Sequence, residues 1–202
     1  MSERRVYLID DDPAMRDSLS FLLSTQDIQV EAFESPLTFL ESAVPLNSGC
    51  IITDMRMPEM TGLQLVRKVQ EKGGCAPIIL ITGHGDVPLA VEAMKAGVSD
   101  FIEKPFSDDV IIGAVHAAFA RAATMDRLEM EKAEAIARIE SLTPREREVM
   151  DGLVAGRANK VIADDLKISA RTVEIYRANV MTKMNAQSLS ELVRSAITSG
   201  LY

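Results

Sequence analysis

Four short runs of apolar, mostly β-branched residues each end in side chains that carry a charge or a hydroxyl. The runs are followed by Asp10-Asp11-Asp12, Asp54, Thr82-Gly83 and Glu103-Lys104-Pro105. Such runs, bounded by Gly and Pro, are typical of buried strands. Segments with helical periodicity separate them, and this alternation predicts a parallel α/β sheet. Parallel strands bring their carboxyl ends to one edge, where sheets of this kind bind ligands.

This pattern accounts for residues 1–121 as one compact domain. The expected strands lie at 6–9, 29–33, 50–54, 77–82 and 99–103. The expected helices lie at 13–24, 36–43, 62–72, 87–96 and from 107 onward.

The residues at the predicted edge favour a site that accepts a phosphoryl group with the help of a divalent metal ion. Asp54 ends the central strand and is the candidate nucleophile, while Lys104 and Thr82 can each bind a phosphoryl oxygen. Such a transfer depends mainly on positioning and on neutralising the charge of the phosphoryl group. Mg²⁺ prefers oxygen ligands. The predicted ligands are Asp11, Asp54, the backbone carbonyl of Arg56 and, through a bound water, Asp10. The isomer of the Lys104-Pro105 bond is left open.

Charge is uneven along the chain of 202 residues, whose net charge is −8. Residues 1–140 carry 13 Lys/Arg against 23 Asp/Glu, and residues 141–202 carry 9 against 7. An acidic first part and a mildly basic second part predict different partners for the two.

No apolar run approaches the roughly 20 residues that a membrane-spanning helix needs, and the first strand follows no signal-peptide pattern. Cys50 and Cys75 match no metal-binding spacing, so we expect both thiols to be reduced and buried. We therefore expect a cytoplasmic protein without a membrane partner.

Residues 122–141 are predicted to form a helical linker. Between Ser107 and Ser141 no Gly follows Gly113 and no Pro occurs. Apolar residues recur at helical spacing, with Lys132 interrupting the stripe Met125, Leu128, Ala135, Ile139 and Leu142. A weak coiled coil and a solvated linker helix both explain this stripe, and both interpretations remain open.

Residues 142–202 are predicted to form an all-α domain of four helices. Thr143-Pro144-Arg145-Glu146 combines an N-cap, a Pro at the first helical position and a capping-box Glu. Lys167-Ile168-Ser169 joins the second and third helices, as is typical of a helix-turn-helix. The expected helices lie at 144–155, 159–166, 170–184 and 189–199.

The first domain resembles the receiver domain of two-component response regulators over about residues 4–121. The motifs are Ile9-Asp10-Asp11-Asp12, Asp54-Met55-Arg56-Met57-Pro58, Thr82-Gly83 and Lys104-Pro105-Phe106. The resemblance implies a flavodoxin-like sheet of order 2-1-3-4-5 and phosphorylation of Asp54 by a histidine kinase. It also implies a switch in which Phe101 turns inward together with Thr82. Residues 82–97 are similar to those of the FixJ group of nitrogen-fixation regulators.

An Asp-nucleophile phosphatase of the haloacid dehalogenase class is the enzymatic alternative. Such enzymes need a second carboxylate, two residues after the nucleophile, as general acid and base. Arg56 occupies that position. Without this acid the acyl phosphate should persist as a signal, which favours a switch over an enzyme. Arg56 and His84, two residues past Asp54 and Thr82, are expected to lie over the site and to influence hydrolysis.

Residues 142–200 resemble the LuxR/NarL type of DNA-binding domain. The motifs are residues 142–149, 159–163 and 169–174. The resemblance implies that Glu174, Ile175 and Ala178 face bases, with Thr172 in the same DNA-binding set. Basic side chains fix a protein on DNA by contacting phosphates. The phosphate candidates are Lys160, Arg171, Arg177 and Lys183.

Together the two resemblances predict a FixJ-type regulator that is phosphorylated, dimerises and activates transcription. The expected dimer surface comprises Val91, Met94, Lys95 and Phe101. The expected partners are a sensor histidine kinase, promoter DNA and RNA polymerase. The FixJ resemblance suggests a haem-containing oxygen sensor as the kinase, and nitrogen-fixation or microaerobic genes as targets. A FixJ-type regulator of another pathway is an alternative. An adaptor that titrates a kinase is another, although the intact reading helix argues against it.

Overall fold

The computed structural model describes residues 5–83 and 87–202, so His84 lies outside the described residues. The chain divides into two compact units, Met1–Met125 and Asp126–Tyr202. Among the described residues, no helix is long and apolar enough to cross a lipid bilayer.

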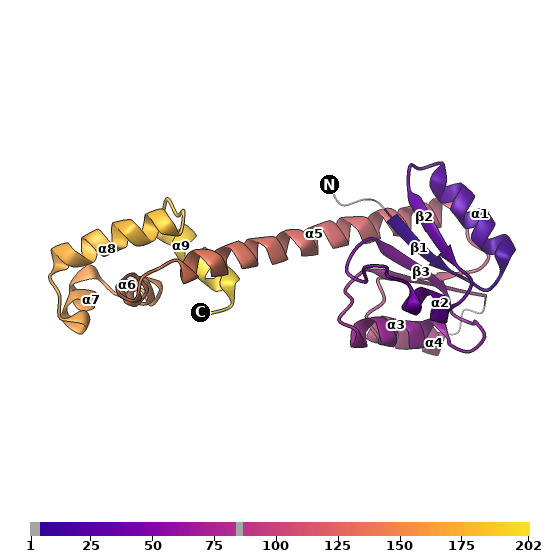
Figure 1. The fold of residues 1–202 in the computed structure, drawn as a ribbon, viewed down its shortest axis with the longest axis horizontal. Coiled ribbons are helices and arrows are strands. Elements are labelled where there is room, and N and C mark those ends of the chain that lie inside the picture. Colours follow the sequence, from indigo (N-terminus) through magenta and orange to yellow (C-terminus); the bar gives the residue numbers. More distant parts are fainter. Residues whose placement is uncertain (1–4, 84–86) are drawn as a thin grey trace. The chain divides into compact units, whose positions relative to one another are not determined.

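The first unit is built on a five-stranded parallel sheet (Figure 1). Every residue of the central strands β3 and β4 is buried. Strands buried on both faces are characteristic of parallel sheets. The strands are β1 Arg5–Ile9, β2 Gln29–Phe33, β3 Cys50–Asp54, β4 Ile78–Thr82 and β5 Asp100–Glu103, in the order β2-β1-β3-β4-β5. The predicted fold class and strand order are therefore confirmed.

Helices cover both faces of the sheet. They are α1 Pro13–Ser24, α2 Pro36–Glu41, α3 Gly62–Glu71, α4 Val87–Lys95 and α5 Asp108–Glu140. Successive residues of a strand point to opposite faces. Tyr7 therefore packs in the core beneath α2 and α3, while Leu8 packs in the core beneath α1 and α5. Helix α2 is shorter than predicted because Ser42 already has extended backbone, with ψ of 157°.

The strand register brings the functional strand ends together. Ile9 pairs with Thr53, Asp54 with Ile81, and Thr82 with Glu103. The residues that end β1, β3, β4 and β5 consequently lie along one edge of the sheet. The Lys104-Pro105 peptide bond at this edge is cis.

Helix α5 is continuous from Asp108 to Glu140 and includes residues 122–140 of the predicted linker. Its apolar stripe is not uniform. Met125 and Leu128 are 55% and 48% exposed, whereas Ile139 is fully buried and packs with Leu142 in the core of the second unit. Within this stripe, only the last part, from Ala135 onward, is buried.

The second unit contains four further helices, which confirms the predicted all-α fold. They are α6 Pro144–Val154, α7 Asn159–Leu166, α8 Ala170–Lys183 and α9 Leu189–Ser199. Thr143 and Glu146 form the predicted capping box of α6, and Ser169 caps α8. Lys167 ends α7 in a left-handed conformation, with φ of 56°, and turns the chain toward α8. Helices α7 and α8 form the helix-turn-helix.

One expectation about the cysteines was wrong. Cys50 is buried in β3, where burial raises the pKa of its thiol to about 12, but Cys75 is exposed. Cys75 lies in the connection between α3 and β4, and connections of this kind run over the protein surface.

Candidate functional site

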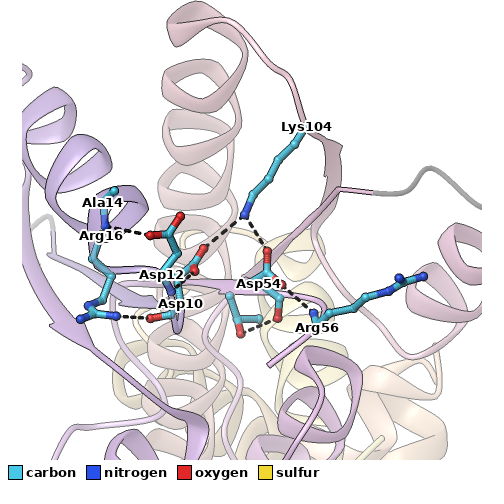
Figure 2. A network of polar contacts seen from close by, with 8 residues as sticks. Asp10, Asp12, Ala14, Arg16, Asp54, Arg56 and Lys104 are labelled. Carbon is cyan, nitrogen blue, oxygen red and sulfur yellow. Dashed lines mark hydrogen bonds and ion pairs between the residues drawn. The ribbon is translucent and has the colours of Figure 1, made fainter. Parts of the chain in front are cut away.

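Three of the predicted site residues meet at the carboxyl edge of the sheet (Figure 2). The Nζ atom of Lys104 lies 2.7 Å from Oδ1 of Asp54 and 3.3 Å from Oδ2 of Asp10. Asp54 ends β3, Asp10 follows β1, and Lys104 follows β5. Two acids from different parts of the chain therefore share one ammonium group.

Burial strengthens the interactions of these charges. Asp10 is 2% exposed and Asp54 is 8% exposed. Burial raises the pKa of Asp10, although the N–H of Asp12 and the charge of Lys104 act in the opposite direction. Burial alone would lower the pKa of Lys104, but its hydrogen bond to Asp54 and the two carboxylate charges outweigh this, so the pKa is raised. One ammonium serves two carboxylates, and the excess negative charge favours an additional cation.

Backbone packing places the Asp54 carboxylate. The N–H of Arg56 donates to Oδ2 of Asp54 at 2.6 Å, which leaves Oδ1 for Lys104. Gly62 allows the start of α3 to lie against the end of β3. A Cβ atom at Gly62 would come within 2.4 Å of the carbonyl oxygen of Asp54 and 2.7 Å of Cδ2 of Leu80. The sequence did not predict this role of Gly62, because a close approach between distant segments leaves no local signal.

Helix α1 supports the loop that carries Asp10. The N–H of Asp12 donates to Oδ1 of Asp10 at 2.9 Å, and Asp12 in turn caps α1 through the N–H of Ala14. The guanidinium of Arg16 donates to the backbone carbonyl of Asp10 at 2.7 Å (Figure 2). Sequence reasoning missed Arg16, because an arginine in the first turns of a helix is usually solvated.

The remaining predicted residues of this site differ in exposure. Asp11 is exposed and Thr82 is fully buried. Phe101 is half-buried and packs against the same core as Tyr7. Within residues 5–83 and 87–202, no three acidic, His or Cys side chains gather closely enough to form a metal site. Asp10 and Asp54 offer the oxygen atoms that Mg²⁺ prefers, so the two buried carboxylates fit this ion. Asp11, the third predicted carboxylate ligand, is not gathered with them.

Helix α8 carries most of the predicted DNA-binding residues on its exposed side. Val173 and Val180 face the core, whereas Ile175 is 56% exposed. The N–H of Thr172 donates to the Ser169 cap at 3.1 Å. The other exposed members of the predicted set are Lys160, Arg171, Glu174, Ala178 and Lys183.

Two of the predicted phosphate contacts have partners within the protein. Arg177 donates to Oδ1 of Asn159 at 3.4 Å. Lys183 donates to Oε2 of Glu146 at 2.7 Å and to the carbonyl of Ser141 at 3.3 Å. Sequence reasoning recognised Glu146 only as a capping residue.

The predicted dimer surface is partly apolar. Val91 and Met94 on α4 are 47% and 55% exposed, and Lys95 is exposed beside them. Together with Ala90 they line a shallow surface hollow. Phe101 on neighbouring β5 is half-buried. Exposed apolar side chains that adjoin one another often mark an interaction surface.

Comparison with known proteins accounts for both units. Residues 6–116 match the response regulator receiver domain, and residues 140–196 match the luxR family of bacterial regulatory proteins. The transcriptional regulatory protein FixJ of Azorhizobium caulinodans is 54% identical over 97% of this chain and 93% of its own length. Nodulation protein W of Bradyrhizobium diazoefficiens is 40% identical over 97% of this chain and 86% of its own. The crystal structure of full-length FixJ from B. japonicum is 48% identical, covers 100% of both chains and has a TM-score of 0.62.

These similarities extend over nearly the whole chain, and the observed strand order agrees with them. The chain belongs to the FixJ-like two-component response regulators, which join a receiver domain to a LuxR-type DNA-binding domain.

Proposed function

We propose that Asp54 accepts a phosphoryl group from a sensor histidine kinase. The observation that carries this proposal is the buried Asp54 carboxylate, 2.7 Å from the ammonium of Lys104 and beside Asp10. An oxygen of Asp54 attacks phosphorus, the bond from phosphorus to the kinase histidine breaks, and the imidazole leaves with that electron pair. Lys104 neutralises charge on one phosphoryl oxygen, and the hydroxyl of Thr82 donates to another.

Mg²⁺ is the proposed cofactor. Asp54, Asp11 and the backbone carbonyl of Arg56 would hold the ion directly, and Asp10 would hold it through water. When bound, the ion would supply positive charge near the phosphoryl group. The shortage of positive charge around Asp10 and Asp54 supports this assignment.

Labelling by acetyl phosphate in the presence of Mg²⁺ tests the acceptor. Asp54→Asn should reduce labelling to background while the protein remains folded, because the amide has nearly the same shape but is not a nucleophile. Asp17→Asn, an exposed residue of α1, is the matched control and should be labelled like the wild type. Persistent labelling of Asp54→Asn would place the nucleophile elsewhere.

An Asp-nucleophile phosphatase is the second candidate, since it would use the same groups. Arg56 stands where such an enzyme needs its general acid and base. We therefore expect the acyl phosphate to accumulate on the protein rather than turn over. Steady release of many equivalents of phosphate per chain would favour the enzyme instead.

Phosphorylation is proposed to promote dimerisation through α4 and β5. When the Thr82 hydroxyl moves to the phosphoryl oxygen, it leaves space that Phe101 can fill by turning inward. This repacks the surface formed by Val91, Met94 and Lys95, which lies next to Phe101. A ligand shifts such an equilibrium only through its different affinity for the two states, and typical coupling changes affinity roughly 5–150-fold.

The second domain is proposed to read promoter DNA through α8. Glu174, Ile175 and Ala178 would face bases, with Thr172 beside them. The exposed side of α8 and the adjacent basic residues support this role. Paired sites multiply affinity, so the phosphorylated dimer should bind more tightly than the monomer. We assign residues 1–121 to the receiver, 122–141 to the linker and 142–202 to the DNA-binding domain.

The regulated pathway is proposed from similarity to FixJ. Activation of nitrogen-fixation or microaerobic genes, with RNA polymerase as partner, fits that relationship, as does an oxygen-sensing haem kinase. Promoter binding would require a cytoplasmic protein. The 40% identity to Nodulation protein W supports the alternative of a related regulator in another pathway.

Selection of bound sites from random DNA, followed by a search for these sites upstream of genes, distinguishes the two pathway assignments. Failure to select any sequence would contradict the regulatory role.

A further inference from the structure

The ammonium group of Lys183 contacts other residues of the helical unit, although Lys183 is exposed and its position on α8 suits a phosphate contact. Its Nζ atom lies 2.7 Å from Oε2 of Glu146 and 3.3 Å from the carbonyl oxygen of Ser141. The side chain of Glu146 is only 5% exposed, and that of Lys183 is 36% exposed. If Lys183 moved out to a phosphate, it would leave a buried carboxylate without its cation, which is strongly unfavourable.

Glu146 is the centre of this contact. The same oxygen, Oε2, accepts hydrogen bonds from the N–H and from the hydroxyl of Thr143, both at 2.9 Å. The hydrogen bond from Lys183, together with that from the Thr143 backbone, lowers the pKa of Glu146 to about 2. Glu146 is therefore ionised at neutral pH, where Lys183 compensates its charge.

This contact joins three segments of the chain. Ser141 follows α5, Thr143 and Glu146 begin α6, and Lys183 is the last residue of α8. The ion pair therefore holds the C-terminal end of α8 against the start of the domain. Val173, near the other end of α8, is fully buried in the core. Helix α8 is thus held near both of its ends.

We propose that Lys183 and Glu146 form a positioning pair that sets the orientation of α8 on DNA, and that Lys183 contacts no phosphate. This inference rests on the proposed DNA-binding function of α8. It leaves Lys160, Arg171 and Arg177 as the phosphate contacts. Without the pair, α8 would still be attracted to DNA by charge, but its base-facing side chains would be less well aligned.

Glu146→Gln distinguishes a phosphate contact from a positioning role for Lys183, because the two roles predict different changes in DNA affinity. The full chain is titrated with a duplex selected by the wild type and with a random duplex of equal length. A phosphate contact predicts tighter binding to both duplexes, because Lys183 is released from its carboxylate. A positioning pair predicts that the ratio of the two affinities falls about tenfold, the size of a single mismatched base pair. An unchanged ratio, or tighter binding, would overturn the proposal.

Salt dependence provides a second test with its own control. Each phosphate contact contributes about 0.9 to the slope of log affinity against log salt concentration. Arg171→Met should therefore reduce the slope by about 1. The double variant Glu146→Gln/Lys183→Met leaves no unpaired buried charge, so it should fold, and it should keep the wild-type slope. A loss of about 1 in the double variant would identify Lys183 as a phosphate contact.

The wild-type chain separates failure of this inference from failure of the proposed function. If the wild type prefers no DNA sequence, the proposed function fails, and the positioning pair fails with it. If the wild type is selective, but the variants show the affinities and the salt slope expected of a phosphate contact at Lys183, only the positioning pair is overturned.

Discussion

At the scale of single residues, the site around Asp54 holds charge that folding alone would not favour. Asp10 and Asp54 are buried together, and Lys104 is the ammonium that contacts both. Burial raises the pKa of Asp10 despite this cation. Functional sites often retain groups that reduce stability, and replacing such a group commonly stabilises the fold at the expense of activity.

Asp10→Asn should raise the free energy of unfolding of the receiver by about 1 kcal/mol at pH 7. The folded-state pKa of Asp10 lies above its ordinary value of 3.8, so its contribution to stability is present below pH 3.8 and is lost as pH rises through the folded pKa. Asn resembles the protonated acid at every pH. Urea unfolding at pH 7 and below pH 3.8 measures the difference, which should disappear at the lower pH. A variant less stable than the wild type at pH 7 would contradict this account.

Arg56 should affect how long the phosphoryl group persists. Its N–H holds Asp54 while its side chain is exposed, so a change of side chain preserves the contact with the acceptor. Arg56→Ala should therefore change the rate of phosphate loss more than the rate of uptake. Decay of labelled protein after removal of acetyl phosphate measures this. Decay at the wild-type rate would make Arg56 an ordinary surface residue.

At the scale of elements, α5 has two different environments along one apolar stripe. Leu128 is exposed, whereas Ile139 is fully buried among helices of the DNA-binding domain. Helical spacing in the sequence does not distinguish them, since both positions recur on the same face. The difference arises because other helices of the second unit cover the last turns of α5, whereas Leu128 lies in a part of α5 that stays exposed.

Leu128→Ala and Ile139→Ala form a matched pair that tests this division. Leu128→Ala should change the free energy of unfolding by no more than about 0.5 kcal/mol, as is usual for surface positions. Ile139→Ala should destabilise the DNA-binding domain by about 2–5 kcal/mol, because it leaves a cavity in the core. Chemical denaturation followed by circular dichroism measures both. Equal losses in the two variants would show that Leu128 is also packed.

At the scale of the whole molecule, the proposed regulation requires that phosphate at one domain alters DNA binding by the other. The proposed route is pairing of two receivers, which raises the effective concentration of the second DNA-binding domain at a paired site. The α4 surface suits pairing because Val91 and Met94 expose apolar area next to Lys95. Switching should consequently depend on protein concentration.

Val91→Asp should leave phosphorylation of Asp54 intact but prevent dimerisation and cooperative DNA binding. A buried, unpaired carboxylate at the interface is strongly unfavourable. Phe21→Asp is the matched control, since Phe21 is an exposed apolar residue of α1, on the opposite face of the sheet. Sedimentation of both phosphorylated variants measures the result. A full-strength dimer of Val91→Asp would remove this surface from the mechanism and direct attention to the exposed part of α5.

The sequence by itself determined the parallel sheet, the capped helices and the edge at which Asp54, Thr82 and Lys104 lie. These follow from local properties, namely periodicity, turn residues and caps, and from motifs that resemble a known family. Tertiary structure alone decided that Asp10 rather than Asp11 is buried beside Lys104, that Arg16 and Gly62 support the site, and that Cys75 is exposed.

Tertiary structure also brought Lys183 to Glu146, 37 residues away in sequence, and Lys104 to Asp54, 50 residues away. Such contacts depend on how separate elements pack. A side chain at one position of an amphipathic helix has the same local pattern whether it faces solvent, DNA or a buried carboxylate. Only the positions of the neighbouring helices distinguish these cases.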